Sequence, residues 1–203
     1  MATPDLETVQ SALMPIGPVV TRAFRRAWQD WQAAGFTHWR PRGRANFIWE
    51  QAAHYTAIDV EQLPGVTVIL KNESYHFLVN DTISFRLKKA DSSGFTQNYP
   101  TQEALAFHDP QLPLTGIPAE HRVEVTYTLN KTATDIYDIA VVARAGELIA
   151  WTYSLLDSDS VASLPVRSKN TPPPISDHST PTGLVRPKGK KNTSDKAGDT
   201  GEQ

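Results

Sequence analysis

The sequence predicts an α+β protein in which N-terminal helices pack on a mostly antiparallel sheet of about six strands, followed by a disordered C-terminal tail. Three observations lead to this prediction. Apolar residues recur at the helical period up to about residue 63, and the period then changes to two as far as residue 156. The end of the chain is rich in proline and lysine and poor in apolar side chains. We therefore expect one domain over residues 1–157 and a tail over 158–203.

Two long helices are expected at the N-terminal end. The first runs from about Val19 to Gly35, because glycine readily takes the left-handed conformation that ends a helix. The second runs from about Arg44 to Glu61 and is closed by Pro64 and Gly65. The apolar faces behind this prediction consist of Val20, Phe24, Ala27, Trp28 and Trp31 in the first helix and of Phe47, Ile48, Ala52, Tyr55 and Ile58 in the second.

Six short segments with strand composition follow, separated by turn sequences. A short helix is expected between the third and fourth strands, where Thr101 can cap it and Pro110 can stop it. The expected strands are Val66–Leu70, Tyr75–Val79, Thr82–Lys89, Arg122–Leu129, Ile136–Arg144 and Leu148–Leu156, and the expected helix is Thr101–His108.

The last two strands flank Ala145-Gly146-Glu147 and are expected to form a hairpin. Their apolar composition indicates a central position in the sheet. On the last strand, Ile149, Trp151, Tyr153 and Leu155 alternate with smaller or more polar residues and should share the inner face.

Composition excludes several classes of protein. The chain has no cysteine, which rules out disulfides and thiolate chemistry. It has no apolar run near the roughly 18 residues of a membrane helix and no secretory signal pattern, so we expect a cytoplasmic protein without membrane contact. Phosphate-binding glycine motifs, the hydrolase nucleophile elbow and the HExxH zinc motif are all missing, and no two histidines have helical spacing. No cofactor and no metal are therefore expected.

Arginine and tryptophan are concentrated between Arg22 and Glu50. Six arginines less the two carboxylates of Asp30 and Glu50 leave this segment with a charge of +4, whereas the whole chain has a net charge of -2. Guanidinium groups beside indoles suit phosphate contact with base stacking, and the same residue types are frequent at protein interfaces. A third interpretation places the tryptophans in the core and leaves the arginines solvated.

A second basic group lies on the third strand, where Ser84, Arg86 and Lys88 alternate with apolar residues. This row is either a solvated face or, if it lies beside the arginine helices, part of a groove of a size that suits RNA. The candidate residues for binding a partner or nucleic acid are Arg22, Arg25, Arg26, Trp28, Trp39, Arg42, Arg44, Arg86 and Lys88.

Several segments carry a resemblance to known proteins: Phe85–Asp91, Asn98–Phe107, Gln111–Leu114, Gly116–Pro118 and Ile149–Leu155. Through them the chain resembles, over about residues 20–156, a family of small bacterial proteins often encoded beside a helix-turn-helix protein with an ImmA-like metallopeptidase domain. Such gene pairs resemble toxin–antitoxin or prophage-control modules. The resemblance therefore implies a protein partner encoded nearby, and it implies no catalytic residue.

We expect a partner-binding component of a toxin–antitoxin or phage-related regulatory pair, which contacts its partner through the helices rich in arginine and tryptophan. The alternative is an RNA- or DNA-directed toxin enzyme similar to a metal-independent ribonuclease. In that enzyme arginine and lysine would stabilise the phosphorane, and a histidine such as His54 or His76 would move the proton. A structural or storage role is a third possibility, which an unclustered distribution of the charges would favour.

Overall fold

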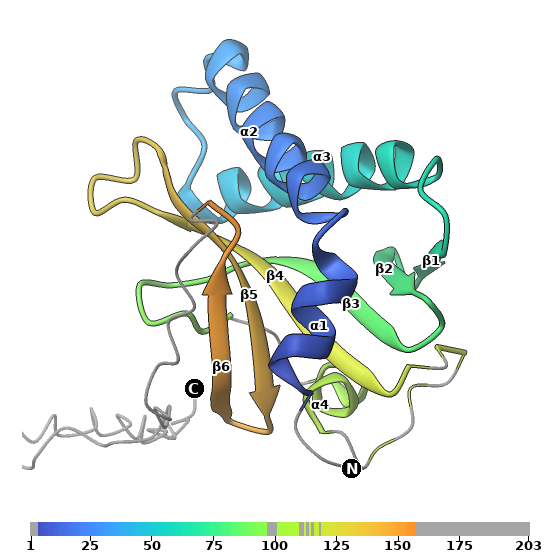
Figure 1. Ribbon diagram of the computed structural model, residues 1–203. Coiled ribbons are helices and arrows are strands. Elements are labelled where there is room, and N and C mark those ends of the chain that lie inside the picture. Colours follow the sequence, from blue (N-terminus) through green and yellow to red (C-terminus); the bar gives the residue numbers. More distant parts are fainter. Residues whose placement is uncertain are drawn as a thin grey trace, which may run out of the picture. The chain divides into compact units, whose positions relative to one another are not determined.

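The computed structural model describes residues 4–96, 101–109, 112, 114, 116, 117 and 119–156, and it confirms the predicted α+β class. The predicted tail lies outside the described residues. Within them, helices and a six-stranded sheet form one layered structure (Figure 1). The helices are α1 (Leu6–Leu13), α2 (Gly17–Ala34), α3 (Pro41–Val60) and α4 (Gln102–His108).

The strands of the sheet follow one another in sequence order, and every neighbouring pair except β3 and β4 is antiparallel. The parallel pair is joined by a crossover that contains α4, because parallel neighbours cannot be linked by a tight hairpin. The strands are β1 (Val66–Lys71), β2 (Ser74–Val79), β3 (Ile83–Lys89), β4 (His121–Leu129), β5 (Ile136–Ala145) and β6 (Leu148–Ser154).

The two long helices follow the prediction closely. Gly35 ends α2 with a φ of 60°, and its N–H donates to the carbonyl of Gln32. Helix α3 begins at Pro41 rather than Arg44, since proline fits the first turn of a helix, where its missing N–H costs nothing. The prediction did not separate α1, whose N-terminus is capped by the Asp5 carboxylate accepting from the Thr8 N–H.

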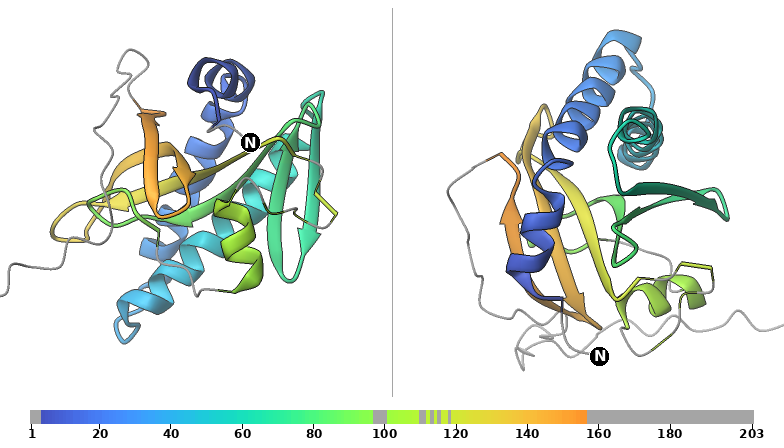
Figure 2. Two further views of the ribbon diagram at one scale, coloured as in Figure 1. Left: turned by 90° about the horizontal axis from the view of Figure 1, so that it is seen from below. Right: turned by 45° about the vertical axis from the view of Figure 1, so that its right-hand side comes forward.

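The main core lies between the α2–α3 pair and one face of the sheet. Phe24 of α2 contacts Tyr127 of β4 with ring centroids 5.1 Å apart, and Phe85 and Leu87 of β3 are buried on the same side. The intervening residue Arg86 points to the opposite face, as strand alternation requires. Helix α4 covers that face (Figure 2).

The predicted central position of the last hairpin is wrong, because β6 is the final strand of the sheet and, among the described residues, pairs only with β5. Its apolar composition has another cause, which is that both of its faces are covered. The Trp151 indole N–H donates to the Pro4 carbonyl, just before α1, at 2.6 Å. On the other face Ile149 packs with Phe95 and Val142.

The expectation that Ile149 shares a face with Trp151 is also wrong. Ala143 pairs with Trp151, but Arg144 pairs with Ile149, so Ala150 is an extra residue on the β6 side. Such a bulge reverses the alternation of the side chains. Trp151 and Tyr153 face the main core as predicted.

Candidate functional site

Four aromatic side chains meet where the α2–α3 hairpin turns, and we call them the hairpin cluster: Trp31, Phe36, Trp39 and Phe47. Phe36 and Trp39 stack with centroids 4.4 Å apart and ring planes 11° apart, and Trp31 lies 5.5 Å from Trp39. Trp39 is 49% exposed and Phe36 is 37% exposed. The cluster therefore presents aromatic surface to solvent in an arrangement held by ring contacts.

Gly43, in the first turn of α3, lets the Trp39 ring approach the helix closely. A Cβ atom at this position would lie 3.0 Å from Trp39 Cε3, which is tighter than ordinary van der Waals contact. This contact and the stack with Phe36 hold an exposed side chain in place. A partner that bound Trp39 would therefore lose little side-chain entropy.

The arginines of the hairpin fall into two groups. Arg25 and Arg42 are exposed and form no hydrogen bond or ion pair within the described part of the chain. Arg26 lies 3.9 Å above the ring of Tyr55, and Arg22 Nη2 lies 4.0 Å from Asp59 Oδ2, so both reach across to α3. The first group is available to a partner, and the second already has contacts at the seam between the helices.

Two of the predicted contact residues, Trp28 and Arg44, are not available on the exposed surface of the hairpin. The prediction is wrong for Trp28, which is only 6% exposed because it lies on the helix face that packs into the core. Arg44 donates from Nη1 to the Ala133 carbonyl in the β4–β5 loop at 2.9 Å. Its guanidinium therefore ties the hairpin to the sheet.

In the basic row on β3, Arg86 lies under α4, whereas Lys88 lies near Trp49 of α3. Ser84 is fully buried and Arg86 is 7% exposed, so the expectation of a solvated row is wrong for both. The parallel register places Glu124 of β4 opposite Arg86, and this carboxylate supplies the charge that makes burial of the arginine tolerable. The RNA-sized groove is consequently not formed by these two basic groups.

Arg86 is the centre of a buried polar network. Its Nε and Nη2 donate to Glu124 Oε1 at 3.1 and 2.8 Å, and the Thr96 hydroxyl donates to Glu124 Oε2 at 2.8 Å. Burial alone would raise the pKa of the Glu124 carboxyl, but the adjacent Arg86 charge brings that pKa below its usual value. The carboxylate is therefore charged at neutral pH and its oxygens have partners.

His108 of α4 joins the network as an acceptor. Its Nε2 lies 3.0 Å from Arg86 Nη2 and 3.3 Å from Arg144 Nη1, and guanidinium groups can only donate. Burial, reinforced by the charges of Arg86 and Arg144, lowers the pKa of His108 to about 3. The ring is therefore neutral, with its proton assigned to Nδ1.

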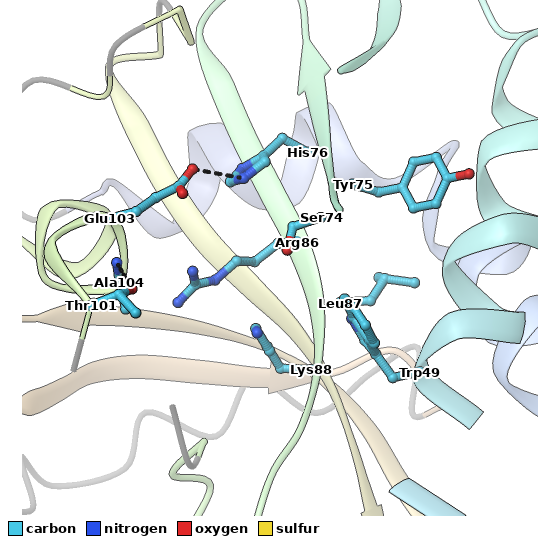
Figure 3. A pocket seen from close by; sticks show the side chains of 10 residues that line it. All are labelled: Trp49, Ser74, Tyr75, His76, Arg86, Leu87, Lys88, Thr101, Glu103 and Ala104. Atoms are coloured by element: carbon cyan, nitrogen blue, oxygen red, sulfur yellow. Dashed lines mark hydrogen bonds and ion pairs between the residues drawn. The ribbon is translucent and has the colours of Figure 1, made fainter. Parts of the chain in front are cut away.

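Divergence of two neighbouring strands opens a pocket. Pairing of β2 with β3 covers only Phe77–Val79 against Ile83–Phe85, and beyond it the β1–β2 hairpin bends away from the other strands (Figure 2). A pocket of about 200 Å³ lies in this notch, reached by Trp49 from α3 and by α4 (Figure 3). Its polar and aromatic lining includes Trp49, Tyr75, His76, Arg86, Lys88 and Glu103.

The pocket has an acidic and a basic side. Glu103 Oε1 lies 3.8 Å from His76 Nε2 and 3.6 Å from Lys71 Nζ, while Asn72 donates to its other oxygen at 2.9 Å. Lys88 forms no hydrogen bond or ion pair with any described residue, and its Nζ lies 5.6 Å from the centre of the Trp49 ring. Burial and the nearby Arg86 charge lower the pKa of Lys88 to about 8. The structure thus gathers the predicted residues His76, Arg86 and Lys88.

The two buried histidines should make the protein less stable in acid. Burial, with Arg86 second, lowers the pKa of His76 to about 4, and that of His108 is about 3. Below pH 6.5 the unfolded chain therefore binds more protons than the folded one, and each histidine should remove about 2 kcal/mol of unfolding free energy between pH 7 and pH 5.

Urea unfolding at these two pH values tests this acid sensitivity. His108→Gln should reduce the difference between them by about 2 kcal/mol, since glutamine does not titrate. The exposed His54 is the matched control, and His54→Gln should leave the difference unchanged. Equal pH dependence in the parent and His108→Gln proteins would contradict a neutral, buried His108.

Proton transfer by His54 receives no structural support. His54, considered for proton transfer, is exposed on α3 and does not line the pocket. Among the described residues, no three side chains of His, Asp or Glu come together as metal ligands. None of the helices in the described part of the chain has the length and apolar character of a membrane-spanning segment.

No family model matches the chain, and neither the curated proteins nor the solved structures contain a significant match. The hairpin cluster and the pocket are therefore the features that bear on function. Sequence reasoning missed Tyr75 and Glu103 in the pocket and His108 and Glu124 in the network around Arg86, and it considered Trp49 only as one of the tryptophans between Arg22 and Glu50. The sequence signal for Glu124 was the alternation of polar and apolar residues along Arg122–Leu129, which places Glu124 on the polar face of its strand.

Proposed function

We propose that this chain is a partner-binding protein whose hairpin cluster docks on an acidic protein partner. The observation that carries the proposal is the exposed and prearranged Trp39, with Phe36 stacked on it and Arg42 in the adjoining turn of α3. Tryptophan and arginine are the side chains that contribute most at protein interfaces when an aromatic anchor is surrounded by polar groups.

Charge identifies the partner's chemistry. The Arg22–Glu50 segment carries a charge of +4, and its exposed Arg25 and Arg42 form no ion pair within the described part of the chain. Complementary charge speeds association and excludes basic partners. The partner that fits is therefore an acidic segment, which matches the positive charge, with an apolar side chain that contacts the exposed Trp39 ring.

A protein partner is favoured over nucleic acid by the position of the second basic group. A polynucleotide that gains affinity from many phosphates needs a continuous basic track. Arg86 is instead buried on the sheet face opposite the helical hairpin, where it pairs with Glu124. Arg86 therefore does not extend the exposed arginines of the hairpin into such a track, although burial and the nearby Arg44 charge lower the pKa of Lys89 at the end of β3.

The second part of the proposal is that the partner is encoded beside this chain, in a toxin–antitoxin or phage-related regulatory pair. It rests on the resemblance described above. The two parts are separable, because a protein partner from elsewhere would leave the role of the hairpin cluster intact.

Calorimetric titration with the product of the adjacent gene tests the surface. Trp39→Ala should weaken binding at least about 30-fold, which corresponds to the 2 kcal/mol of an interface hot spot. The single variant Arg42→Glu should also weaken binding, because the new carboxylate repels an acidic partner. Arg42→Glu should leave the melting temperature nearly unchanged, because its side chain lies at the surface. Trp39→Ala removes ring contacts with Phe36 and Trp31 and should lower the melting temperature, so its binding is measured well below that temperature.

Tyr137→Ala and Lys131→Glu are the matched controls. Tyr137 is a 73% exposed aromatic side chain on β5, and Lys131 is an exposed cation in the β4–β5 loop. Both variants should bind like the parent. Parent-like binding by Trp39→Ala and Arg42→Glu would remove the hairpin cluster from the interface.

An enzyme acting on RNA or DNA is the second candidate, and one observation favours it. His76, Arg86 and Lys88, the residue types needed to move a proton and stabilise a phosphorane, line the same pocket. His76 is only 1% exposed, however, and Arg86 is already paired with Glu124. Both features favour binding in this pocket over proton transfer.

A further inference from the structure

We propose that the pocket between β2 and β3 binds a small organic oxyanion, a carboxylate or a phosphate monoester, with the Lys88 ammonium as its direct contact. The proposal is independent of the hairpin cluster. It rests on the distribution of charge around the pocket, on the size of the pocket and on the aromatic side chains that line it.

The charges around the pocket are not balanced on the side of Lys88. Glu124 is the carboxylate paired with Arg86, and both of its oxygens are occupied, Oε1 by Arg86 and Oε2 by the Thr96 hydroxyl. Lys88, two residues from Arg86 on the same face of β3, therefore has no counter-charge in contact among the described residues. Glu124 attracts Lys88 without contacting it, and this attraction does not offset the desolvation of the ammonium and its repulsion by Arg86. A bound anion would compensate the remaining charge.

Glu103 determines the orientation in which an anionic ligand would lie in the pocket. Figure 3 shows Glu103 and His76 on one side of the Arg86 guanidinium and Lys88 on the other. The Glu103 carboxylate repels an anionic group, whereas Lys88 attracts it. The charged end of a ligand would therefore lie at Lys88, and any hydroxyl or amine that it carries could donate to Glu103.

Size and lining define the remainder of the ligand. A volume of about 200 Å³ is below the range of about 300–1,000 Å³ typical of sites for drug-sized ligands, so a small metabolite fits. Trp49 provides aromatic surface on the side of the pocket near Lys88 (Figure 3). An aryl or short alkyl group attached to the oxyanion would contact this ring.

Lys88 makes the proposal testable by pH as well as by mutation. Its pKa of about 8 in the protein means that the ammonium form is lost as the pH rises from 7 to 9. A bound oxyanion stabilises the charged form, so the affinity should be highest below pH 8 and should decrease above it. Benzoate is a suitable probe because it does not titrate in this range.

The experiment is calorimetric titration of the full chain with benzoate, phenyl phosphate, acetate and inorganic phosphate. We expect the aryl probes to bind, and Lys88→Met to weaken them at least tenfold and to abolish the pH dependence of benzoate binding. Lys88→Arg, which keeps the charge, should retain binding but lose that pH dependence. Lys131→Met and Trp39→Ala are controls for a surface cation and for the hairpin cluster, and both should bind like the parent.

The probes also identify the source of the anion. Tighter binding of phenyl phosphate and benzoate than of phosphate and acetate supports an organic ligand. Equal binding of the free ions would assign the site to an inorganic oxyanion and overturn the organic part of the proposal. The proposal as a whole is overturned if no probe binds at 10 mM, the highest concentration used, or if Lys88→Met and Lys88→Arg both bind with the parent's affinity and pH dependence.

Discussion

Replacing Glu124 with leucine is expected to lower the free energy of unfolding by about 3–5 kcal/mol, because it leaves the buried Arg86 charge without its counter-ion. Glu124 is 1% exposed, and Arg86 donates to it twice. The measurement is urea unfolding at pH 7. Glu61→Leu, at an exposed carboxylate just after α3, is the control and should change the unfolding free energy by less than about 0.5 kcal/mol.

The double variant Arg86→Met with Glu124→Leu separates the lost charge from the lost volume. If the uncompensated arginine causes the instability, removing both charges should recover a large part of the loss, since apolar side chains of similar volume replace buried ion pairs at little cost. A loss below about 1 kcal/mol in the single variant would show that Arg86 finds solvent or another partner, and the buried network would then not hold α4 to the sheet.

Replacing Trp151 with alanine is expected to cost about 3–5 kcal/mol through the cavity it leaves in the main core. The side chain is 8% exposed, packs near Tyr153, and donates its indole N–H to the Pro4 carbonyl. The same change therefore removes core volume and the contact that holds the start of α1 against β6.

Trp151→Phe distinguishes these two contributions, because phenylalanine keeps much of the volume but cannot donate. Its expected loss of unfolding free energy is clearly smaller and includes the 1–3 kcal/mol of an unsatisfied buried carbonyl. Urea unfolding measures both variants. Cooperative unfolding of Trp151→Ala with a loss below about 1 kcal/mol would place this side chain outside the core.

Periodicity was sufficient to predict the main elements. The long helices and all six strands occur within a few residues of their expected positions. Each of them buries one face, and this leaves a local period of apolar residues that the sequence shows. The separate helix α1 was not predicted, since Pro15 and Pro18 interrupt the apolar pattern around it. The bulge at Ala150 was also invisible, because one extra residue changes which face a side chain occupies without changing composition.

The sites depended more strongly on tertiary structure. Trp28 and Trp39 both lie among arginines in the sequence, but the first is in the core and the second is half exposed. The pair of Arg86 and Glu124 depends on the parallel register of β3 and β4, which no local pattern specifies. The pocket at Lys88 arises where β2 and β3 stop pairing, and the sequence gives no sign of that divergence.

The most direct test of the central claim, that the hairpin cluster binds a protein rather than a nucleic acid, is the salt dependence of binding. Calorimetry would compare the product of the adjacent gene with a 20-nucleotide single-stranded RNA at 50 and 200 mM salt. We predict that the protein complex persists at 200 mM salt, because apolar burial around Trp39 is not screened. Tight RNA binding that weakens about 10³-fold or more over this range, with no binding of the neighbouring protein, would contradict the account.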